Sequence, residues 1–426
     1  MTLNLRIHKY IDSDGGPPPE VFATVYAVDP NSGRRRESKS FRELVPISTE
    51  AKDFRSLKVG AGHYLVEVAM PSGDLLSDQV SVPASGNAEL VLQAEDSPHE
   101  WLGWQHLMGN VPAVPTRTRT WRGVTGKPTD AAGGSLEYLT TPLQDLIPSL
   151  TGNAWKALAR LPKGPTPLAR ALNTGGPTRT VPISMRDEHL AVYRVLHGNA
   201  SVSGATALRS ALPRDFIAVP QGETVELVSL PMPWYIGDGE REAVIEIIVQ
   251  QTARDQDFST SLTVRDDKLG VLLGYLSSGS LGAAREFADT ATAMLYGKVR
   301  NPLAAAAGGY ALVGTVVDSA DHEWHQWVRN LCNWFEQIPD GAIQLAQLHL
   351  RRRRDSVDFD EAAKWLKIGY RRGVPFYSLG VRWLLEGLEK LSRFDPELEE
   401  MSEAVRAVAW RIHPQSPFTI IQLERE

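Results

Sequence analysis

The residues with the clearest chemical potential are two histidines beside a glutamate, in the run His322-Glu323-Trp324-His325. A zinc protease needs two histidines one helical turn apart, at positions i and i+4, with a glutamate between them. Here the histidines stand at i and i+3, and the sequence suggests no distant third ligand. We favour a solvated helix start with tryptophans facing the core. Because one cysteine cannot form a thiolate cluster either, we predict no tightly bound metal.

Three other segments imitate catalytic motifs without meeting their requirements. Residues 123–129 mimic a phosphate-binding loop, but Trp121 and Pro128 stand where a glycine and a Ser or Thr are needed. Residues 276–280 lack the G-x-S-x-G pattern of a nucleophile elbow. Cys332 lies in an amphipathic, tryptophan-rich stretch, which favours burial over reactivity. The sequence therefore predicts no catalytic, cofactor-binding or metal-ligating residue.

Two basic runs remain, at residues 34–36 and 351–354, each made only of arginines. A turn between two helices would push the four guanidinium groups of the second run into water together. Arginines pair in a bidentate way with carboxylates or phosphates, so either run could hold an acidic partner or nucleic acid, or form a protease-sensitive loop. The alternative is a solvated charged turn. We predict as partner-binding residues Arg351, Arg352, Arg353, Arg354 and, as an apolar anchor, Trp365.

The overall composition narrows the class of protein. The 426 residues carry 45 Lys and Arg against 51 Asp and Glu, a formal net charge of −6 that suits non-specific nucleic-acid binding poorly. Hydrophobic residues make up 42%, enough to build a core in each of two or three domains. The single cysteine excludes an intrachain disulfide, and the first residues lack the apolar core of a signal peptide. We expect a cytoplasmic protein.

Hydrophobic periodicity divides the chain into four parts that would position these residues. Residues 1–95 alternate apolar and polar positions and predict a small β-sandwich. Residues 96–176 predict a connector with short helices. Residues 177–266 predict a second β-rich domain, which we interpret as another sandwich, and residues 267–426 predict a helical domain. The connector would pack onto its neighbours through three tryptophans, Trp101, Trp104 and Trp121.

The helical part has the pattern of α-hairpins. Pro302 suits the first turn of a helix, and Asp358 with Glu361 has the spacing of a capping box. Trp365-Leu366 followed by Gly369-Tyr370 approaches the tetratricopeptide pattern, although the spacing does not match. The predicted fold class is thus multidomain, β then α, with a C-terminal α-hairpin, tetratricopeptide-like domain. One apolar stripe is expected from Trp324, Trp327, Val328, Leu331 and Phe335.

Two parts of the chain resemble known families. The phrase from Leu57 to Val82 resembles the prealbumin-like β-sandwiches of carboxypeptidase-regulatory and surface proteins, which carry no active site. The phrases from Lys298 to Tyr310 and from Asn330 to Ala342 resemble the C-terminal helical region of certain bacterial proteins. These are encoded beside caspase-like (CHAT-type) proteases in conflict and type III CRISPR-associated defence loci. The resemblance implies an adaptor, regulator or protease substrate, and it transfers no site residue.

We therefore expect a non-enzymatic interaction protein of a bacterial antiviral defence system. Its expected partner is another protein, a caspase-like protease or a regulatory factor, with no membrane or nucleic acid involved. Two other functions stay open. A hydrolase assembled from scattered residues would show a pocket with converging acid, base or metal-ligand groups. A carbohydrate-binding module would show exposed tryptophans on a sandwich, and an adaptor would show a broad apolar patch instead.

Overall fold

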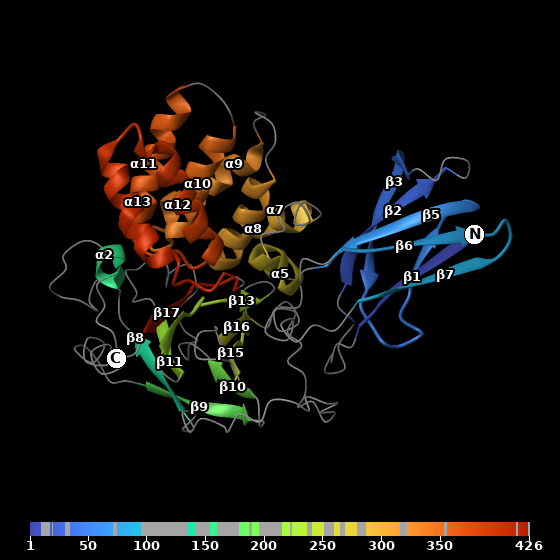
Figure 1. Cartoon of the computed structure of the whole chain (residues 1–426), viewed down its shortest axis with the longest axis horizontal. Coiled ribbons are helices and arrows are strands. Elements are labelled where there is room, and N and C mark those ends of the chain that lie inside the picture. The colour runs from blue at the N-terminus through green and yellow to red at the C-terminus, as the bar shows by residue number, and fades with distance from the viewer. Residues whose placement is uncertain are drawn as a thin grey trace. The chain divides into compact units, whose positions relative to one another are not determined.

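The computed structural model of the chain has strands in the first part of the sequence and helices in the last (Figure 1). This order confirms the predicted layout, β then α, and its cause is the change of hydrophobic period from about two to about three and a half. The structure describes residues 1–9, 18, 20–29, 35–70, 75–94, 135–140, 154–159, 179–186, 190–195, 215–221, 224–236, 241–250, 260–264, 269–278, 287–315, 322–352, 356–414 and 416–424.

The N-terminal strands form two sheets that enclose one apolar core. The first sheet has the order β4-β1-β7 and the second the order β3-β2-β5-β6. Alternate residues of β1 and β5 face this core, because Leu3, Ile7, Val66 and Val68 are fully buried. The strand bounds are β1 Thr2–His8, β2 Glu20–Val28, β3 Arg35–Pro46, β4 Arg55–Lys58, β5 Gly62–Ala69, β6 Leu75–Val82 and β7 Asn87–Gln93.

The remaining strands form one eight-stranded sheet and a two-stranded ribbon, β13 with β14. The order of the sheet is β16-β15-β10-β9-β8-β11-β12-β17, and all its pairs are antiparallel. The strand bounds are β8 Ser135–Thr140, β9 Arg179–Arg186, β10 Leu190–Val195, β11 Asp215–Gln221, β12 Thr224–Ser229, β13 Tyr235–Ile236, β14 Arg241–Glu242, β15 Ile245–Gln250, β16 Thr260–Val264 and β17 Ile420–Glu424.

This sheet corrects three expectations. Apart from the ribbon of β13 and β14, the described strands of residues 177–266 lie in a single sheet, whereas these residues suggested a second sandwich. Every residue of β16 is buried, as are Val225 to Ser229 of β12, so neither strand has the exposed face that an alternating pattern implies. The segment expected as a connector supplies a central strand, β8, and the segment expected as helical ends in an edge strand, β17.

Helices form the C-terminal part of the chain, and the neighbours α7–α8, α10–α11 and α12–α13 pack as hairpins (Figure 1). Pro302 is the first residue of α8, as predicted, and the Asn301 side chain accepts a hydrogen bond from the Ala304 N–H. The bounds are α5 Gly270–Ser278, α7 Ala288–Tyr296, a 3₁₀ turn η3 Gly297–Val299, α8 Pro302–Gly314, α9 Glu323–Trp334, α10 Pro339–Arg351, α11 Ser356–Arg372, α12 Ser378–Ser392 and α13 Pro396–Ala409.

A buried carboxylate joins three of these segments. Asp340, in the first turn of α10, accepts hydrogen bonds from the Tyr310 hydroxyl (2.8 Å) and from the backbone N–H groups of Phe376 (2.8 Å) and Tyr377 (3.1 Å). The Tyr377 hydroxyl donates in turn to the Leu303 carbonyl at 2.7 Å. Desolvation by burial and the Asp340 charge raise the pKa of Tyr310 well above its ordinary value, so this hydroxyl stays a donor.

The short helix α2 (Ala154–Ala159) packs on the helical array through a tryptophan. Trp155 is fully buried, stacks on Tyr370 with ring centroids 6.3 Å apart, and donates from Nε1 to the Tyr370 carbonyl at 3.2 Å. Within the segment 96–176, helix α2 therefore packs onto the helical array through Trp155. The three tryptophans expected to do so, Trp101, Trp104 and Trp121, lie outside the described residues.

The described residues form two compact units. Those of 1–122 and 267–286 make one unit, in which the Tyr275 hydroxyl of α5 donates to the Ala69 carbonyl at 2.7 Å. Those of 123–266 and 287–426 make the other. The domain boundaries predicted near residues 95, 176 and 266 follow changes of sequence pattern and stay predictions. No described helix is both long and apolar enough to cross a membrane.

Candidate interaction surface

Arg351, the first of the four arginines predicted to bind a partner, packs against other residues of the helical array. Arg351, the last residue of α10, is half-buried, and its guanidinium lies 5.0 Å from the centre of the Trp383 ring. It also donates to the Gly314 carbonyl at the end of α8, at 3.3 Å. Burial lowers the pKa of Arg351, an effect that the nearby Glu386 charge opposes. The four arginines therefore do not all project into water together.

The other predicted residues have mixed surroundings. Arg352 is half-buried at the C-cap of α10, while Arg353 and Arg354 lie outside the described residues. Trp365 is half-buried, donates from Nε1 to Glu361 at 3.1 Å, and carries the Lys364 ammonium 5.2 Å from its ring centre. Trp365 thus has local partners on its own helix, and no described contact brings it together with Arg351.

The predicted capping box at the start of α11 is wrong. The helix begins at Ser356, which places Asp358 inside the first turn. There the Asp358 carboxylate lies 3.3 Å from His349 Nδ1, at the end of α10, and Glu361 bonds to Lys364 and Trp365. The acidic residue of one helix start therefore faces a basic residue of the preceding helix end, an arrangement that the two helix dipoles favour.

A second surface, absent from the predicted residues, lies where α7 ends beside α9. Tyr296 is 69% exposed, Val299 is 46% exposed and Trp334 is 43% exposed. Trp327 is half-buried and packs edge-on against Tyr296, with ring centroids 5.1 Å apart. We call these four residues the α9 aromatic surface. Exposed clusters of large apolar side chains are uncommon on a surface that contacts only water.

Helical spacing explains why only part of the predicted stripe is buried. Val328, Leu331 and Phe335 point into the core and are fully buried, as predicted. Trp327 and Trp334 are seven residues apart, two turns of helix, and therefore share a side at the border of that stripe. The number of tryptophans on α9 is the feature of the sequence that could have indicated this surface. Its other half, Tyr296 and Val299, comes from the end of α7 and the η3 turn and carried no signal.

Lys298 lies beneath the α9 aromatic surface and is only 4% exposed. Its Nζ is 5.7 Å from the ring centre of Trp327 and 5.4 Å from that of Trp334. It donates one hydrogen bond, at 3.3 Å, to the Leu295 carbonyl, and no described carboxylate lies within ion-pair distance. Burial lowers the pKa of Lys298. The faces of the two indole rings thus offset part of the free-energy cost of removing the Lys298 ammonium from water, since this ammonium has no counter-ion among the described residues.

The other motif-like segments show no catalytic arrangement among the described residues. His325 is buried, and its Nδ1 accepts from the His322 backbone N–H at 3.3 Å. No group of three or more His, Cys, Asp or Glu side chains with metal-site geometry occurs among the described residues. Cys332 is buried as predicted, and desolvation raises the pKa of its thiol although Arg372 donates to the sulfur. Residues 123–129 lie outside the described residues.

The first basic run, at residues 34–36, contains two arginines that have local partners. Arg35 bonds to Glu67 at 3.3 Å, and Arg36 forms an ion pair with Asp29; Arg34 lies outside the described residues. Both pairs are exposed, and such pairs contribute little to stability. Both residues lie at the start of strand β3, so this part of the run is not a turn, and their exposed local pairs favour a solvated charged strand end over a binding site.

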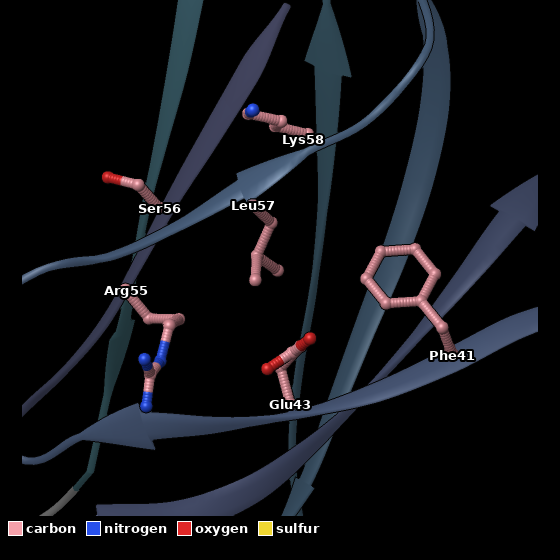
Figure 2. Close-up of a pocket in the computed structure, with 6 residues that line it drawn as sticks. All are labelled: Phe41, Glu43, Arg55, Ser56, Leu57 and Lys58. Atoms are coloured by element: carbon pink, nitrogen blue, oxygen red, sulfur yellow. The ribbon is translucent and has the colours of Figure 1, made fainter.

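A cleft of about 440 Å³ lies in the N-terminal sandwich, between β3 and β4 (Figure 2). Its lining holds one carboxylate, Glu43, and no histidine, and the Ser56 and Lys58 side chains point away from Glu43, so these groups do not converge as an acid–base pair (Figure 2). Residues 1–95 contain no tryptophan, and the exposed Trp334 and Trp410 both belong to the helical part. The cleft therefore does not favour a hydrolase, and the sandwich does not favour a carbohydrate-binding module.

Comparison with known proteins finds one family. Residues 271–420 match the family described as the Y4kD C-terminal domain, which is about a third of the chain. The match begins in α5 and ends at the first residue of β17, and it includes all four residues of the α9 aromatic surface. No curated protein and no solved structure matches the chain. The helical part of this protein is thus similar to the Y4kD C-terminal domain.

Proposed function

We propose that this protein is a non-enzymatic interaction protein that binds a partner protein through the α9 aromatic surface. The observation that supports this function is the combination of exposed Tyr296, Val299 and Trp334 with the buried Lys298, whose ammonium has no carboxylate partner in the described part of the chain. Tyrosine and tryptophan dominate the binding energy of protein interfaces, because they bury a large area and lose little conformational freedom.

The chemistry of the surface defines the partner segment. Apolar side chains would cover Tyr296 and Val299 and remove them from water. A glutamate or aspartate at the same place would give the Lys298 ammonium its counter-ion in surroundings of low polarity, where a charge pair is strong. The partner segment is therefore apolar and carries an acidic residue.

The proposed setting is that of an adaptor, regulator or protease substrate that works with a caspase-like protease or a regulatory factor in bacterial defence. This proposal rests on the resemblance of the phrases from Lys298 to Tyr310 and from Asn330 to Ala342 to proteins encoded beside such proteases. Those two phrases contain Lys298, Val299 and Trp334, so they coincide in part with the surface that we propose for docking.

Arg352, Arg353, Arg354 and Trp365 are proposed as a second, electrostatic contact. Arg351 belongs to the packing of the helical array, so its replacement would confound a binding test. The triple variant Arg352→Gln, Arg353→Gln, Arg354→Gln, with Arg351 kept, isolates the loop. We expect it to reduce partner capture at low salt and to change capture little at high salt, since steering by exposed charges is screened.

Affinity capture tests the proposed function. The wild-type chain and the variant Trp334→Ser are immobilised, and proteins retained from a lysate of the source cells are quantified at two salt concentrations. We expect specific partners to bind the variant about tenfold to thirtyfold more weakly, the loss typical of a central aromatic contact. The variant Lys298→Met should weaken capture at both salt concentrations, because salt screens a buried charge pair little.

Trp410→Ser provides the matched control, because Trp410 is also an exposed tryptophan of the helical part, 65% exposed, and lies outside the α9 aromatic surface. Its captured set should equal that of the wild-type chain, and thermal melting checks that each variant is folded at the temperature of the capture experiment. Equal capture by Trp334→Ser and wild type would contradict the proposed function.

A further inference from the structure

The N-terminal sandwich has one open edge, and it lies far in sequence from the α9 aromatic surface. β3 is the last strand of one sheet and β4 the last strand of the other. At the opposite edge β6 and β7 pack closely, whereas β3 and β4 make few contacts, among them the hydrogen bond from Arg55 to the Leu44 carbonyl. The cleft of about 440 Å³ lies between β3 and β4 and is lined by Phe41, Glu43, Arg55, Ser56, Leu57 and Lys58 (Figure 2).

Among the described strands, β4 has a partner on one side of its backbone only. On that side β4 pairs with β1 in the register Leu3↔Leu57 and Asn4↔Ser56, and the Val59 N–H donates to the Met1 carbonyl. In an antiparallel ladder the bonded pairs alternate. The N–H and C=O groups of Leu57 therefore point to β1, and those of Ser56 and Lys58 point to the open side. Such a row of backbone groups is a template for an added strand.

The side chains in the cleft form an apolar floor with a negative charge. Leu57 extends from β4 toward β3, and Phe41 and Glu43 extend from β3 toward it, while Ser56 and Lys58 point away (Figure 2). Leu57 is 5% exposed, and Phe41 and Glu43 are half-buried. The Glu43 carboxylate has no ion-pair partner among the described residues.

Arg55 closes one end of the cleft and leaves the Glu43 charge uncompensated. Its Nε donates to the Leu44 carbonyl at 2.7 Å, and a terminal nitrogen donates to Glu20 at 3.0 Å. The arginine thus ties β4 to the second sheet and has its counter-ion in Glu20. The charge that remains for a ligand in the cleft is that of Glu43, which is negative.

We propose that the open edge of β4 binds an extended peptide segment of a partner protein, which carries a basic residue between apolar residues. The segment adds as a strand beside β4, with backbone hydrogen bonds to Ser56 and Lys58. Its basic side chain reaches Glu43, and an apolar neighbour covers Phe41 and Leu57. Backbone bonds supply affinity in this mode of recognition, and the alternating side chains supply specificity.

Peptide binding to the full chain tests the proposal. The probes are fluorescein-labelled eight-residue peptides of alternating threonine and valine, with lysine, glutamine or glutamate at one central position. We expect the lysine peptide to bind the wild-type chain most tightly and the glutamate peptide least. Glu43→Gln should weaken the lysine peptide by roughly threefold to tenfold and leave the glutamine peptide unchanged. Glu89→Gln, an exposed glutamate on β7, is the matched control.

The backbone arm of the test uses Ser56→Pro and a peptide methylated on alternate backbone nitrogens. Proline removes the Ser56 N–H, which faces the open side, so the sandwich keeps its ladder with β1 while binding is lost. Ser56→Ala keeps the N–H and should bind normally. The methylated peptide should fail to bind the wild-type chain. If Ser56→Pro does not fold, this peptide still tests the backbone hydrogen bonds between the added strand and β4.

Three results would overturn the proposal. One is the absence of binding of all three peptides at concentrations up to about 1 mM. Another is equal binding of the lysine peptide by wild type and Glu43→Gln together with normal binding of the methylated peptide. The third is self-association of the chain that Ser56→Pro abolishes without any peptide binding, which would assign the edge to a second copy. None of these results affects the α9 aromatic surface.

Discussion

At the scale of the residue, Arg351 shows how a side chain in a charged run can belong to the core. Its guanidinium packs on Trp383 and bonds to Gly314, so part of its stem and charge is removed from water. We expect Arg351→Gln to lower the free energy of unfolding by about 1–2 kcal/mol, because it loses a desolvated cation–π contact and a hydrogen bond. Urea denaturation followed by tryptophan fluorescence measures this loss.

Arg406→Gln is the comparison for that measurement. Arg406 bonds to Glu389 across the helical surface, and both side chains are about half exposed. An exposed ion pair contributes about 0.5 kcal/mol or less. If the two variants lost the same small amount, Arg351 would be a solvated residue and the described packing would have no energetic weight.

At the scale of the element, Asp340 fixes the relative positions of α8, α10 and the turn before α12. Removing its carboxylate leaves one hydroxyl and two backbone N–H groups without an acceptor in a buried place. We therefore expect Asp340→Ala to lower the free energy of unfolding by about 3–5 kcal/mol. Thermal unfolding monitored by circular dichroism at helix wavelengths reports this loss.

Tyr310→Phe removes only one of the three donors and leaves the carboxylate bonded to Phe376 and Tyr377. Its expected cost is about 1–2 kcal/mol. The informative quantity is the ratio of the two losses in the free energy of unfolding, for Asp340→Ala and for Tyr310→Phe. Similar losses for both would mean that the backbone bonds of Asp340 add nothing, and that it does not join these elements.

At the scale of the whole molecule, the C-terminal segment ties the helical array to the sheet. The Thr419 N–H donates to the Phe376 carbonyl, and the Ser229 N–H of β12 donates to the Thr419 carbonyl. Phe418 packs edge-on against Trp234, with ring centroids 6.0 Å apart. His413 lies in this segment, and its backbone N–H donates to the Ile420 carbonyl. Burial lowers the pKa of the His413 imidazole from 6.5 to about 4.

This pKa predicts a specific dependence of stability on pH. Between pH 6.5 and about 4 the unfolded chain binds a proton at His413 that the folded chain does not, so acidification favours unfolding. Above pH 6.5 the imidazole is neutral in both states and contributes nothing. We expect a loss of about 1–3 kcal/mol on going from pH 7 to pH 4, discounted for the partial exposure of the ring.

The variant His413→Gln isolates this contribution, because it removes the titration and leaves every other group in place. Its free energy of unfolding should fall less steeply with acid than that of the wild-type chain, and the two curves should run parallel above pH 6.5. Parallel curves over the whole range from pH 7 to pH 4 would show that His413 titrates normally in the folded protein.

The sequence by itself determined the features that depend on local pattern. The alternation of apolar and polar residues in 1–95 predicted strands there, and β1 with Leu3 and Ile7 is one of them; the pattern of 177–266 likewise predicted strands, among them those with Val192 and Ile247. The three- and four-residue steps on α9 predicted the burial of Val328 and the other core residues of that helix. These outcomes follow from backbone geometry, which sets the period at which side chains return to one face.

Only the tertiary structure decided which surfaces those elements cover. Arg351 lies on Trp383, more than thirty residues away, and β17 pairs with β12, almost two hundred residues before it. The same long-range packing buries Trp383 and leaves Trp334 exposed, although both stand on amphipathic helices. The periodicity of apolar residues predicts which face of its own helix or strand a side chain occupies. The neighbour that removes it from water comes from elsewhere in the chain, and no local pattern encodes that neighbour.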